Sequence, residues 1–251
     1  MITHYDHIML PTVSRQGVRE FYVNRLGFEI DHETDEEISL RAGSHCRLTF
    51  KEAFEAISPV HIAFEVPYGL LDSIVGQADQ KAVPFLHGMD GNVIEDFGTG
   101  KNAYFRDGDG HLLEIIAHPS NEGESAATGS WMPVLYVREV GFPVPSVADF
   151  REKLVQLLEF RLEQASEQFT FAIGGTAHAV VVSDQRRWFP IDMIALPHRA
   201  SVSLAAERPS DWAAIRSRLT AAGIPFQDVE EQGGSFELEG YRFHIAPKPA
   251  G

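Results

Sequence analysis

The sequence predicts an α+β protein made of four βαβββ modules grouped into two pairs. One order of elements, an apolar strand, a helix and three short strands, recurs four times along the 251 residues. His7, His61 and Glu114 stand at nearly equal intervals, each inside an apolar run typical of a β-strand. Arg19-Glu20 in the first expected helix is echoed by Arg151-Glu152 in the third. A repeated module explains all three observations.

The first module occupies residues 5–51. Its helix is amphipathic, and Gly43-Ser44 supplies the turn between its last two strands. The expected elements are a strand at Tyr5–Pro11, a helix at Val18–Leu26, a strand entered through Gly27–Ile30, and strands at Glu37–Ala42 and Cys46–Lys51.

The second module repeats this order and closes with a hairpin. Asp107–Gly110 reads Asp-Gly-Asp-Gly, which supplies the positive φ values that a tight hairpin needs. His111 directly follows this turn, and we expect it to be a surface or turn residue. The expected elements are a strand at Val60–Val66, a helix at Leu70–Gln80, a lead-in at Val83–Phe85, and strands ending with Ala103–Arg106 and His111–Ala117.

A linker separates the second module from the third. Pro119–Gly129 is small, polar and without periodicity, as linkers are. We therefore predict a domain at residues 1–118, a linker at 119–134 and a second domain at 135–251. The second domain is expected to hold strands at Val140–Val144, Phe160–Glu163, Phe169–Ile173, Ala179–Ser183, Ser201–Ala205, Ser235–Glu239 and Tyr241–Ala246, with helices at Asp149–Leu158 and Trp212–Ala222.

Composition restricts the partners. A net charge of −15 without a Lys/Arg stripe disfavours nucleic acid and anionic membranes, because phosphate binding needs clustered cations. No apolar run approaches the ~18 residues of a membrane-spanning helix. Cys46 is the single cysteine, so no intrachain disulfide forms. We expect a cytoplasmic protein, monomer or homodimer, whose partner is a small-molecule substrate.

Glu114 is the residue that points most directly to a metal. It lies within Leu112–Ile116, Leu-Leu-Glu-Ile-Ile, where an uncompensated carboxylate is costly to bury. A cation or a hydrogen-bonded partner is therefore required. His7 and His61 stand in similar strands, and two imidazoles with one carboxylate form a suitable site for a divalent ion.

These residues resemble the vicinal oxygen chelate superfamily, which contains glyoxalase I, bleomycin- and fosfomycin-resistance proteins and extradiol dioxygenases. The resemblance covers most of residues 4–118 and extends to 135–247 by pattern alone. It implies two half-barrel domains, with His7, His61 and Glu114 as ligands of one ion. The matching segments are Asp6–Ile8, Phe21-Tyr22, Leu26–Phe28, Val60–Phe64 and Tyr104–Glu114.

The resemblance implies a divalent-metal-dependent enzyme for a small substrate with vicinal oxygens. The reaction would be ring cleavage by a dioxygenase, or that of a glyoxalase-like lyase or isomerase. Fe²⁺ is the favoured ion, with Zn²⁺, Mn²⁺ or Ni²⁺ as alternatives. Tyr104 is the candidate catalytic residue, donating a hydrogen bond to a developing oxyanion. The alternative is a non-catalytic protein that binds a drug or antibiotic and confers resistance.

Departures from the family pattern limit the choice of subfamily. Arg47 stands where glyoxalase I has a further glutamate ligand, and Met9 replaces a threonine of fosfomycin-resistance enzymes. Residues 95–101 lack the histidine expected in extradiol dioxygenases. In the second half the ligand positions fall near Glu139, Ser201 and His244, so we expect a degenerate domain without metal.

Overall fold

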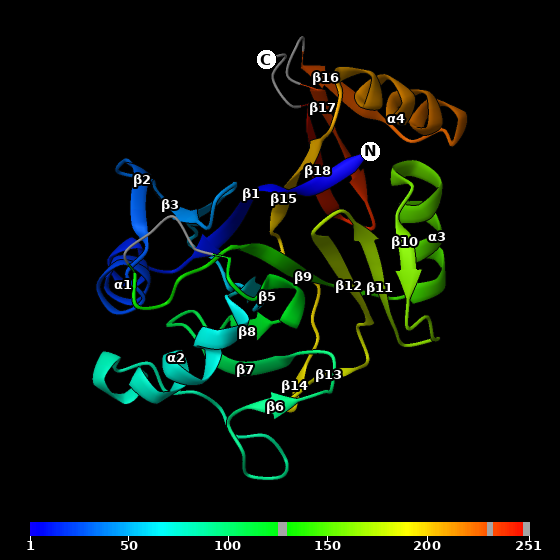
Figure 1. Ribbon diagram of the computed structural model, residues 1–251. Coiled ribbons are helices and arrows are strands. Elements are labelled where there is room, and N and C mark those ends of the chain that lie inside the picture. Colours follow the sequence, from blue (N-terminus) through cyan, green and yellow to red (C-terminus); the bar gives the residue numbers. More distant parts are fainter. Residues whose placement is uncertain (125–129, 230–232, 248–251) are drawn as a thin grey trace.

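The chain folds into two eight-stranded sheets that lie side by side (Figure 1). The computed structural model describes residues 1–124, 130–229 and 233–247. Within this part the four expected βαβββ modules are present, paired into two half-barrels, which confirms the α+β prediction. A small two-stranded sheet, β13–β14, is the third sheet that these residues form.

The first module begins with a strand longer than predicted. Its helical segment starts at Arg15 because the Ser14 side chain accepts a hydrogen bond from the Gly17 backbone nitrogen and caps the first turn. The segment then continues as a π-helix. The elements are β1 (Ile2–Thr12), α1 (Arg15–Val18), η1 (Arg19–Arg25), β2 (Glu29–Glu33), β3 (Glu37–Ala42) and β4 (Cys46–Glu52).

The second module has the predicted order of elements with a broken helix. Two short 3-10 turns flank the α-helix at either end. The elements are β5 (His61–Glu65), η2 (Tyr68–Leu70), α2 (Leu71–Gln77), η3 (Asp79–Lys81), β6 (Glu95–Asp96), β7 (Lys101–Arg106) and β8 (Leu112–Ala117), followed by the turn η4 (Pro119–Asn121).

The third and fourth modules repeat the arrangement with longer helices. Ser146 caps the first of these helices by accepting from the Asp149 backbone nitrogen. None of the described helices is long and apolar enough to cross a membrane. The elements are β9 (Tyr136–Val144), α3 (Val147–Leu158), β10 (Arg161–Glu163), β11 (Phe169–Gly174), β12 (Ala177–Ser183), β13 (Arg187–Trp188), β14 (Met193–Ile194), β15 (Ser201–Ala206), α4 (Pro209–Ala221), β16 (Phe226–Val229), β17 (Gly233–Leu238) and β18 (Tyr241–Pro247).

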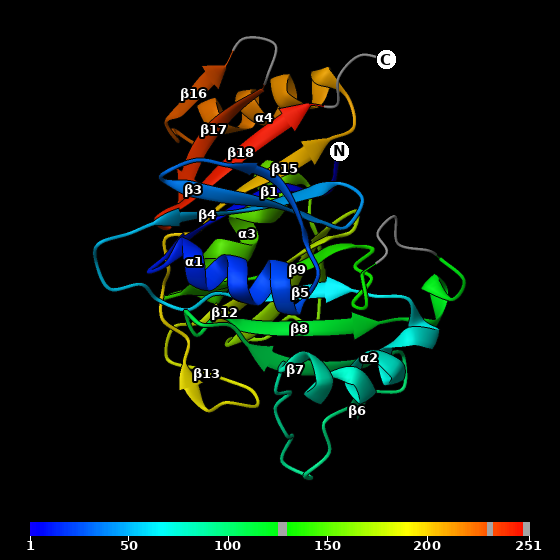
Figure 2. The same ribbon diagram turned by 90° about the vertical axis from the view of Figure 1, so that its left-hand side faces the viewer.

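The modules pair first with fourth and second with third. One sheet has the strand order β16-β17-β18-β15-β1-β4-β3-β2 and the other β10-β11-β12-β9-β5-β8-β7-β6. β1 is joined to β15 by antiparallel pairing, and β5 is joined to β9 in the same way. Figure 2 shows the first sheet above the second. Each half-barrel therefore contains one module from each half of the chain.

Strands that precede the expected linker, residues 119–134, therefore pair with strands that follow it. Residues 125–129 of this linker lie outside the described residues. The described ends of this linker are hydrogen-bonded to the second and the first module. Asn121 donates to the Glu65 carboxylate at 2.6 Å. On the other side Ser130 donates to the Leu26 carbonyl at 2.8 Å, and the Trp131 indole donates to the Arg25 carbonyl at 2.6 Å. The expected domains, residues 1–118 and 135–251, each contain two consecutive modules. The sheets instead combine the first module with the fourth and the second module with the third.

The expectation that His111 lies at the surface is wrong, because the residue is fully buried. Its Nδ1 accepts from the Val60 backbone nitrogen at 3.0 Å. His111, Asp107 and Asp109 form a group with metal-ligand atom types, and both carboxylates accept several hydrogen bonds from the protein. Asp107 accepts from Tyr22 and from two backbone nitrogens, and Asp109 accepts from Thr12 and one backbone nitrogen. This group fixes the β7–β8 hairpin against the first module.

His198 fastens the connection between the third and fourth modules to β9. Its Nε2 donates to the Gly141 carbonyl at 2.7 Å, and its Nδ1 accepts from the Ala200 backbone nitrogen at 3.2 Å. Both ring nitrogens are thus used in the neutral form. Burial is the main cause that lowers the pKa of His198 to about 4.

We expect His198 to make the protein sensitive to acid. Below its unfolded-state pKa of about 6.5 the unfolded chain takes up a proton that the folded chain refuses until about pH 4. The free energy of unfolding should therefore fall by about 1.4 kcal/mol per pH unit between these values. Urea unfolding from pH 7 to pH 4 should give a shallower pH dependence for His198→Gln than for the wild type. His32→Gln, at an exposed position of β2, is the control and should keep the wild-type slope.

Candidate metal centre

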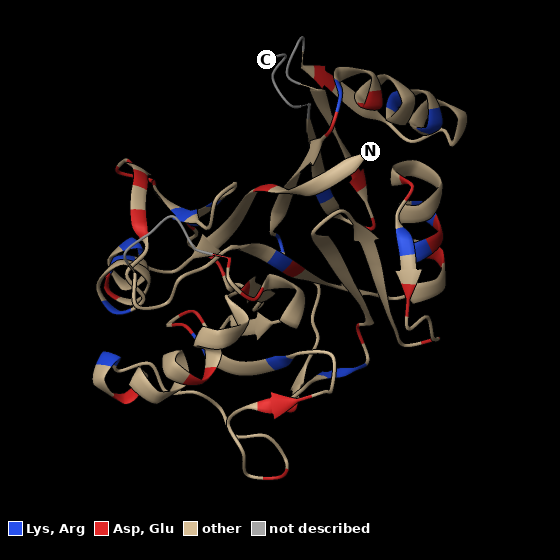
Figure 3. Cartoon of the chain, viewed as in Figure 1, with Lys and Arg blue, Asp and Glu red and all other residues tan. Residues whose placement is uncertain are grey.

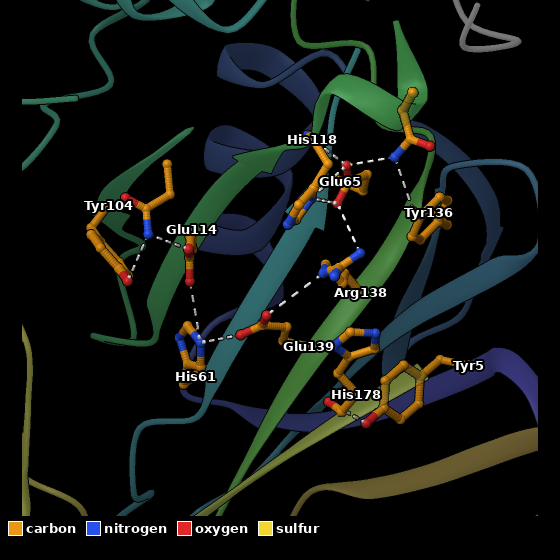
Figure 4. A network of polar contacts seen from close by, with 12 residues as sticks. Tyr5, His61, Glu65, Tyr104, Glu114, His118, Tyr136, Arg138, Glu139 and His178 are labelled. Atoms are coloured by element: carbon orange, nitrogen blue, oxygen red, sulfur yellow. Dashed lines mark hydrogen bonds and ion pairs between the residues drawn. The ribbon is translucent and has the colours of Figure 1, made fainter. Parts of the chain in front are cut away.

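Three buried side chains converge on the inner face of the sheet formed by the second and third modules (Figure 4). His61, Glu114 and Glu139 each place a ligand-type atom within 4.8 Å of the others. The His61 Nε2 atom lies 3.4 Å from a Glu114 oxygen and 3.6 Å from a Glu139 oxygen. All three side chains are at least nine-tenths buried. The arrangement surrounds one point with a nitrogen and two carboxylates.

Strand register explains why these residues meet. In the parallel pair β5–β8, Ala63 lies beside Glu114. In the antiparallel pair β5–β9, the same Ala63 lies beside Glu139. Partners in adjacent strands point to the same side, and residues two apart in one strand share a face. Ala63 therefore has a carboxylate on each side and His61 two positions before it, and its small side chain leaves the space between them open.

The hydrogen bond of His61 directs its free nitrogen towards the carboxylates. Nδ1 lies 3.3 Å from the Leu112 carbonyl oxygen, which can only accept, so Nδ1 carries the proton. In the neutral ring Nε2 then has a lone pair, and Nε2 is the atom that faces Glu114 and Glu139. Backbone carbonyls commonly orient metal-binding histidines in this way.

Glu114 is held by Asn102 from the neighbouring strand β7. The Asn102 amide donates to Glu114 Oε1 at 2.8 Å and lies 3.1 Å from the Tyr104 hydroxyl. Burial, followed by the negative charge of Glu139, raises the pKa of Glu114 well above its usual value. The raised pKa of Glu114 shows that two ionised carboxylates this close together are unfavourable.

A third carboxylate, Glu65, lies at the other end of the same strand as His61. It is completely buried and accepts hydrogen bonds from the His118 backbone and ring and from Asn121. Arg138 lies between it and the cluster, with Nη1 3.4 Å from Glu65 and Nε 3.8 Å from Glu139. Figure 4 shows this chain of contacts running from His118 to His61.

The charges of this buried region do not cancel. Glu65, Glu114 and Glu139 carry three negative charges when ionised, and Arg138 supplies one positive charge. Carboxylates in excess of cationic side chains are costly to bury, and a divalent cation would offset this cost. The donor set therefore fits a divalent ion.

His7 is not brought to this cluster. It lies on β1 in the other sheet, where Nε2 is 2.7 Å from the Thr49 hydroxyl, and Thr49 also contacts Ser39 at 2.7 Å. Ser203 is the register partner of both His7 and His244. Of the expected triad, the structure thus joins His61 and Glu114 and adds Glu139 from the third module.

A cavity of about 550 Å³ opens in front of the cluster. Tyr104, the expected catalytic residue, lines it together with the three cluster residues. Burial is the largest cause that raises the pKa of Tyr104, followed by the charges of Glu114 and Glu139, so the phenol stays protonated. The rest of the lining combines polar and charged residues with an apolar, largely aromatic stretch formed by Leu112, Phe169, Phe171, Val180, Val182, Trp188 and Phe189.

Trp188 covers the cluster from the β13–β14 hairpin. Its ring lies 5.2 Å from the His61 ring, and the adjacent Phe189 ring lies 6.0 Å from Tyr104. Trp188 fits because residue 141 on β9 is glycine: a Cβ there would stand 2.7 Å from the indole and 3.0 Å from the His61 Cβ. The hairpin therefore seals the apolar side of the cavity.

Sequence reasoning missed four functional positions: Asn102, Arg138, Glu139 as part of the first site, and Trp188. The argument used for Glu114, a carboxylate within an apolar segment, could also have been applied to Glu139. Glu139 stands between Val137 and Val140 and is buried. Its strand was predicted to begin at Val140, whereas β9 begins at Tyr136. Trp188 had no comparable signal, because its hairpin has no counterpart in the module pattern.

Comparison with known proteins identifies related structures, although the sequence itself has no match. No protein-family model and no curated protein match the chain. A "putative dioxygenase" from Bacillus subtilis subsp. subtilis str. 168 is 16% identical, with a TM-score of 0.74 over 100% of this chain and 86% of that one. Glyoxalase I from Zea mays is 12% identical, with a TM-score of 0.58 over 97% of this chain and 92% of that one. At these identities the likeness shows a shared fold.

We expect Gly141→Ala to disturb the cluster and the hairpin together. The added methyl group overlaps Trp188 and presses on His61, and overpacking of this kind typically costs about 1–3 kcal/mol. Chemical unfolding should show this loss, and tryptophan fluorescence should report greater solvent exposure. Gly76→Ala is the matched control, since a Cβ in that turn of α2 meets nothing within 4 Å. Equal stability of the two variants would contradict the proposed packing of Trp188.

Proposed function

The chain has the fold of the vicinal oxygen chelate superfamily, and on this premise we propose that it is a divalent-metal-dependent enzyme acting on a small substrate with adjacent oxygen atoms. The proposed ligands are His61, Glu114 and Glu139. The observation that carries the proposal is the convergence of these three buried groups with an excess negative charge on one wall of a cavity.

The ligand set bears on the choice of ion. Fe²⁺ suits two imidazoles and one carboxylate, the set expected from His7, His61 and Glu114. Here a second carboxylate, Glu139, replaces one imidazole, and oxygen ligands favour harder ions such as Mn²⁺. We therefore place Mn²⁺ before Fe²⁺ and keep Zn²⁺ as an alternative. The bound ion would act as a Lewis acid on adjacent substrate oxygens, which favours a lyase or isomerase over a ring-cleaving dioxygenase.

The residues around the cluster orient the substrate and keep water away. Asn102 contacts both Glu114 and Tyr104, so it fixes the carboxylate and the phenol relative to each other. Tyr104 remains protonated and can donate a hydrogen bond to an oxygen atom that gains negative charge. Trp188 excludes water from the His61 side. A binding protein without metal is disfavoured, since burying Glu114 and Glu139 without a cation lowers stability.

We expect one divalent ion per chain, lost on substitution of any proposed ligand. His61→Ala, Glu114→Gln and Glu139→Gln should each lower ion affinity by at least ~10-fold, since each removes a charge or a lone pair from the site. Metal analysis of protein purified without chelator, followed by titration calorimetry with Mn²⁺ and Zn²⁺, measures this.

The control is His7→Ala, which removes a histidine of the same predicted triad from the other sheet. It should bind the ion as the wild type does. Loss of the ion from His7→Ala, together with full retention in Glu139→Gln, would instead support the triad expected from the sequence. Unaltered ion content in all three ligand variants would refute the site.

Tyr104→Phe should reduce turnover without releasing the ion. Loss of one oxyanion donor typically lowers the rate by ~10²-fold. Candidate substrates are catechols, hydroquinones and thiol conjugates of 2-oxoaldehydes, screened with Mn²⁺-, Zn²⁺- and Fe²⁺-loaded protein. Phe189→Leu is the control, because it changes the ring beside Tyr104 and leaves the phenol in place. Equal turnover of wild type and Tyr104→Phe would remove Tyr104 from the mechanism.

A further inference from the structure

We propose that the substrate carries an anionic group, a carboxylate or a similar anion, that binds Arg186, and a planar apolar body that lies along the aromatic wall of the cavity. This inference rests on the proposed function and specifies its substrate class. Arg186 lines the cavity and lies three residues after the end of β12. Its guanidinium lies over the Phe169 ring, 4.8 Å from the centroid.

Arg186 differs from the other arginines of the cavity in having no carboxylate partner among the described residues. Arg138 contacts Glu65 and Glu139, and Arg187 contacts Asp192 at 3.5 Å. The Phe169 ring holds the Arg186 guanidinium in place by a cation–π contact and leaves its in-plane N–H donors free. A planar guanidinium with free donors is suited to bind a carboxylate in bidentate geometry.

The sheet order places this cation far from the acidic rim of the cavity. Glu95 stands on β6, at one edge of the sheet, whereas Phe169 stands on β11, next to the opposite edge. Glu163, which also lines the cavity, is paired with Arg161. In Figure 3 the basic colour marks β13, which begins directly after Arg186, whereas β6 is acidic. An anion is therefore attracted to the Arg186 end and repelled from the Glu95 end.

Between Arg186 and the metal centre the wall is apolar. Phe171, Val180, Val182 and Trp188 belong to one buried apolar cluster, and all four line the cavity. A planar ring can contact these side chains with its faces, while its anionic group reaches Arg186 and its adjacent oxygens reach His61, Glu114 and Glu139. In a protein with a net charge of −15, an unpaired cation inside the cavity compensates for the general repulsion of an anion.

The test compares trans-cinnamate with its neutral amide, cinnamamide, by titration calorimetry with metal-free protein. Neither probe has adjacent oxygens, so the comparison does not depend on a bound ion. Arg186→Gln should weaken cinnamate binding by about 10-fold, as expected for one charge-assisted contact, and leave cinnamamide binding within about 2-fold. Arg187→Gln, the neighbouring arginine already paired with Asp192, should leave both affinities unchanged. Retained cinnamamide binding shows that the cavity of each variant is intact.

Equal cinnamate affinity in wild type and Arg186→Gln would overturn the proposal, and so would an equal loss for both probes. A second arm repeats the titration with 3,4-dihydroxycinnamate and Zn²⁺-loaded protein. Tighter binding of 3,4-dihydroxycinnamate to Zn²⁺-loaded than to metal-free protein supports the metal centre. If Zn²⁺ does not tighten this binding, while Arg186→Gln still weakens cinnamate binding, the proposed function is refuted and the anion site is kept. The two failures are therefore distinguishable.

Discussion

The antiparallel pairing of β5 with β9 is the contact on which the site depends. It places Glu139 of the third module beside Ala63 of the second, while the parallel pairing of β5 with β8 places Glu114 on the other side. A shift of one residue would turn the Glu139 side chain to the opposite face of the sheet. The site is therefore a product of strand register across two modules, and no single module contains it.

Burial of charge is the second constraint. Glu65, Glu114 and Glu139 are all removed from water. Arg138 contacts Glu65 and Glu139, and His61 contacts Glu114 and Glu139. Glu65 is stabilised by several hydrogen bonds, so its burial is compensated within the protein. Glu114 accepts one such bond, from Asn102, and its burial, followed by the charge of Glu139, raises its pKa. The same sheet thus holds one carboxylate that several hydrogen bonds compensate and, in the candidate centre, two carboxylates that accept fewer hydrogen bonds.

The sequence predicted the module repeat because strand and helix periodicity is local. It also predicted His61 and Glu114, whose buried surroundings are visible in the residues next to them. It could not predict which modules pair, because every first strand has an apolar pattern that fits any of the others. That choice decides whether His7 or Glu139 lies near His61. In the structure β5 pairs with β9, so Glu139 lies near His61 and His7 lies in the other sheet. The Trp188 hairpin was beyond prediction for a related reason, since its place depends on a gap at Gly141.

The grouping of modules also has a consequence for synthesis. β1 is made first, yet its antiparallel partner β15 follows almost 200 residues later. The second and third modules are adjacent in sequence, so their sheet can close while the C-terminal segment is still being made. Until β15 arrives, one edge of β1 lacks its native partner, and such an edge can pair with other chains. The half-barrel that holds the candidate centre can therefore form first, and the half-barrel that joins the two ends of the chain is completed last.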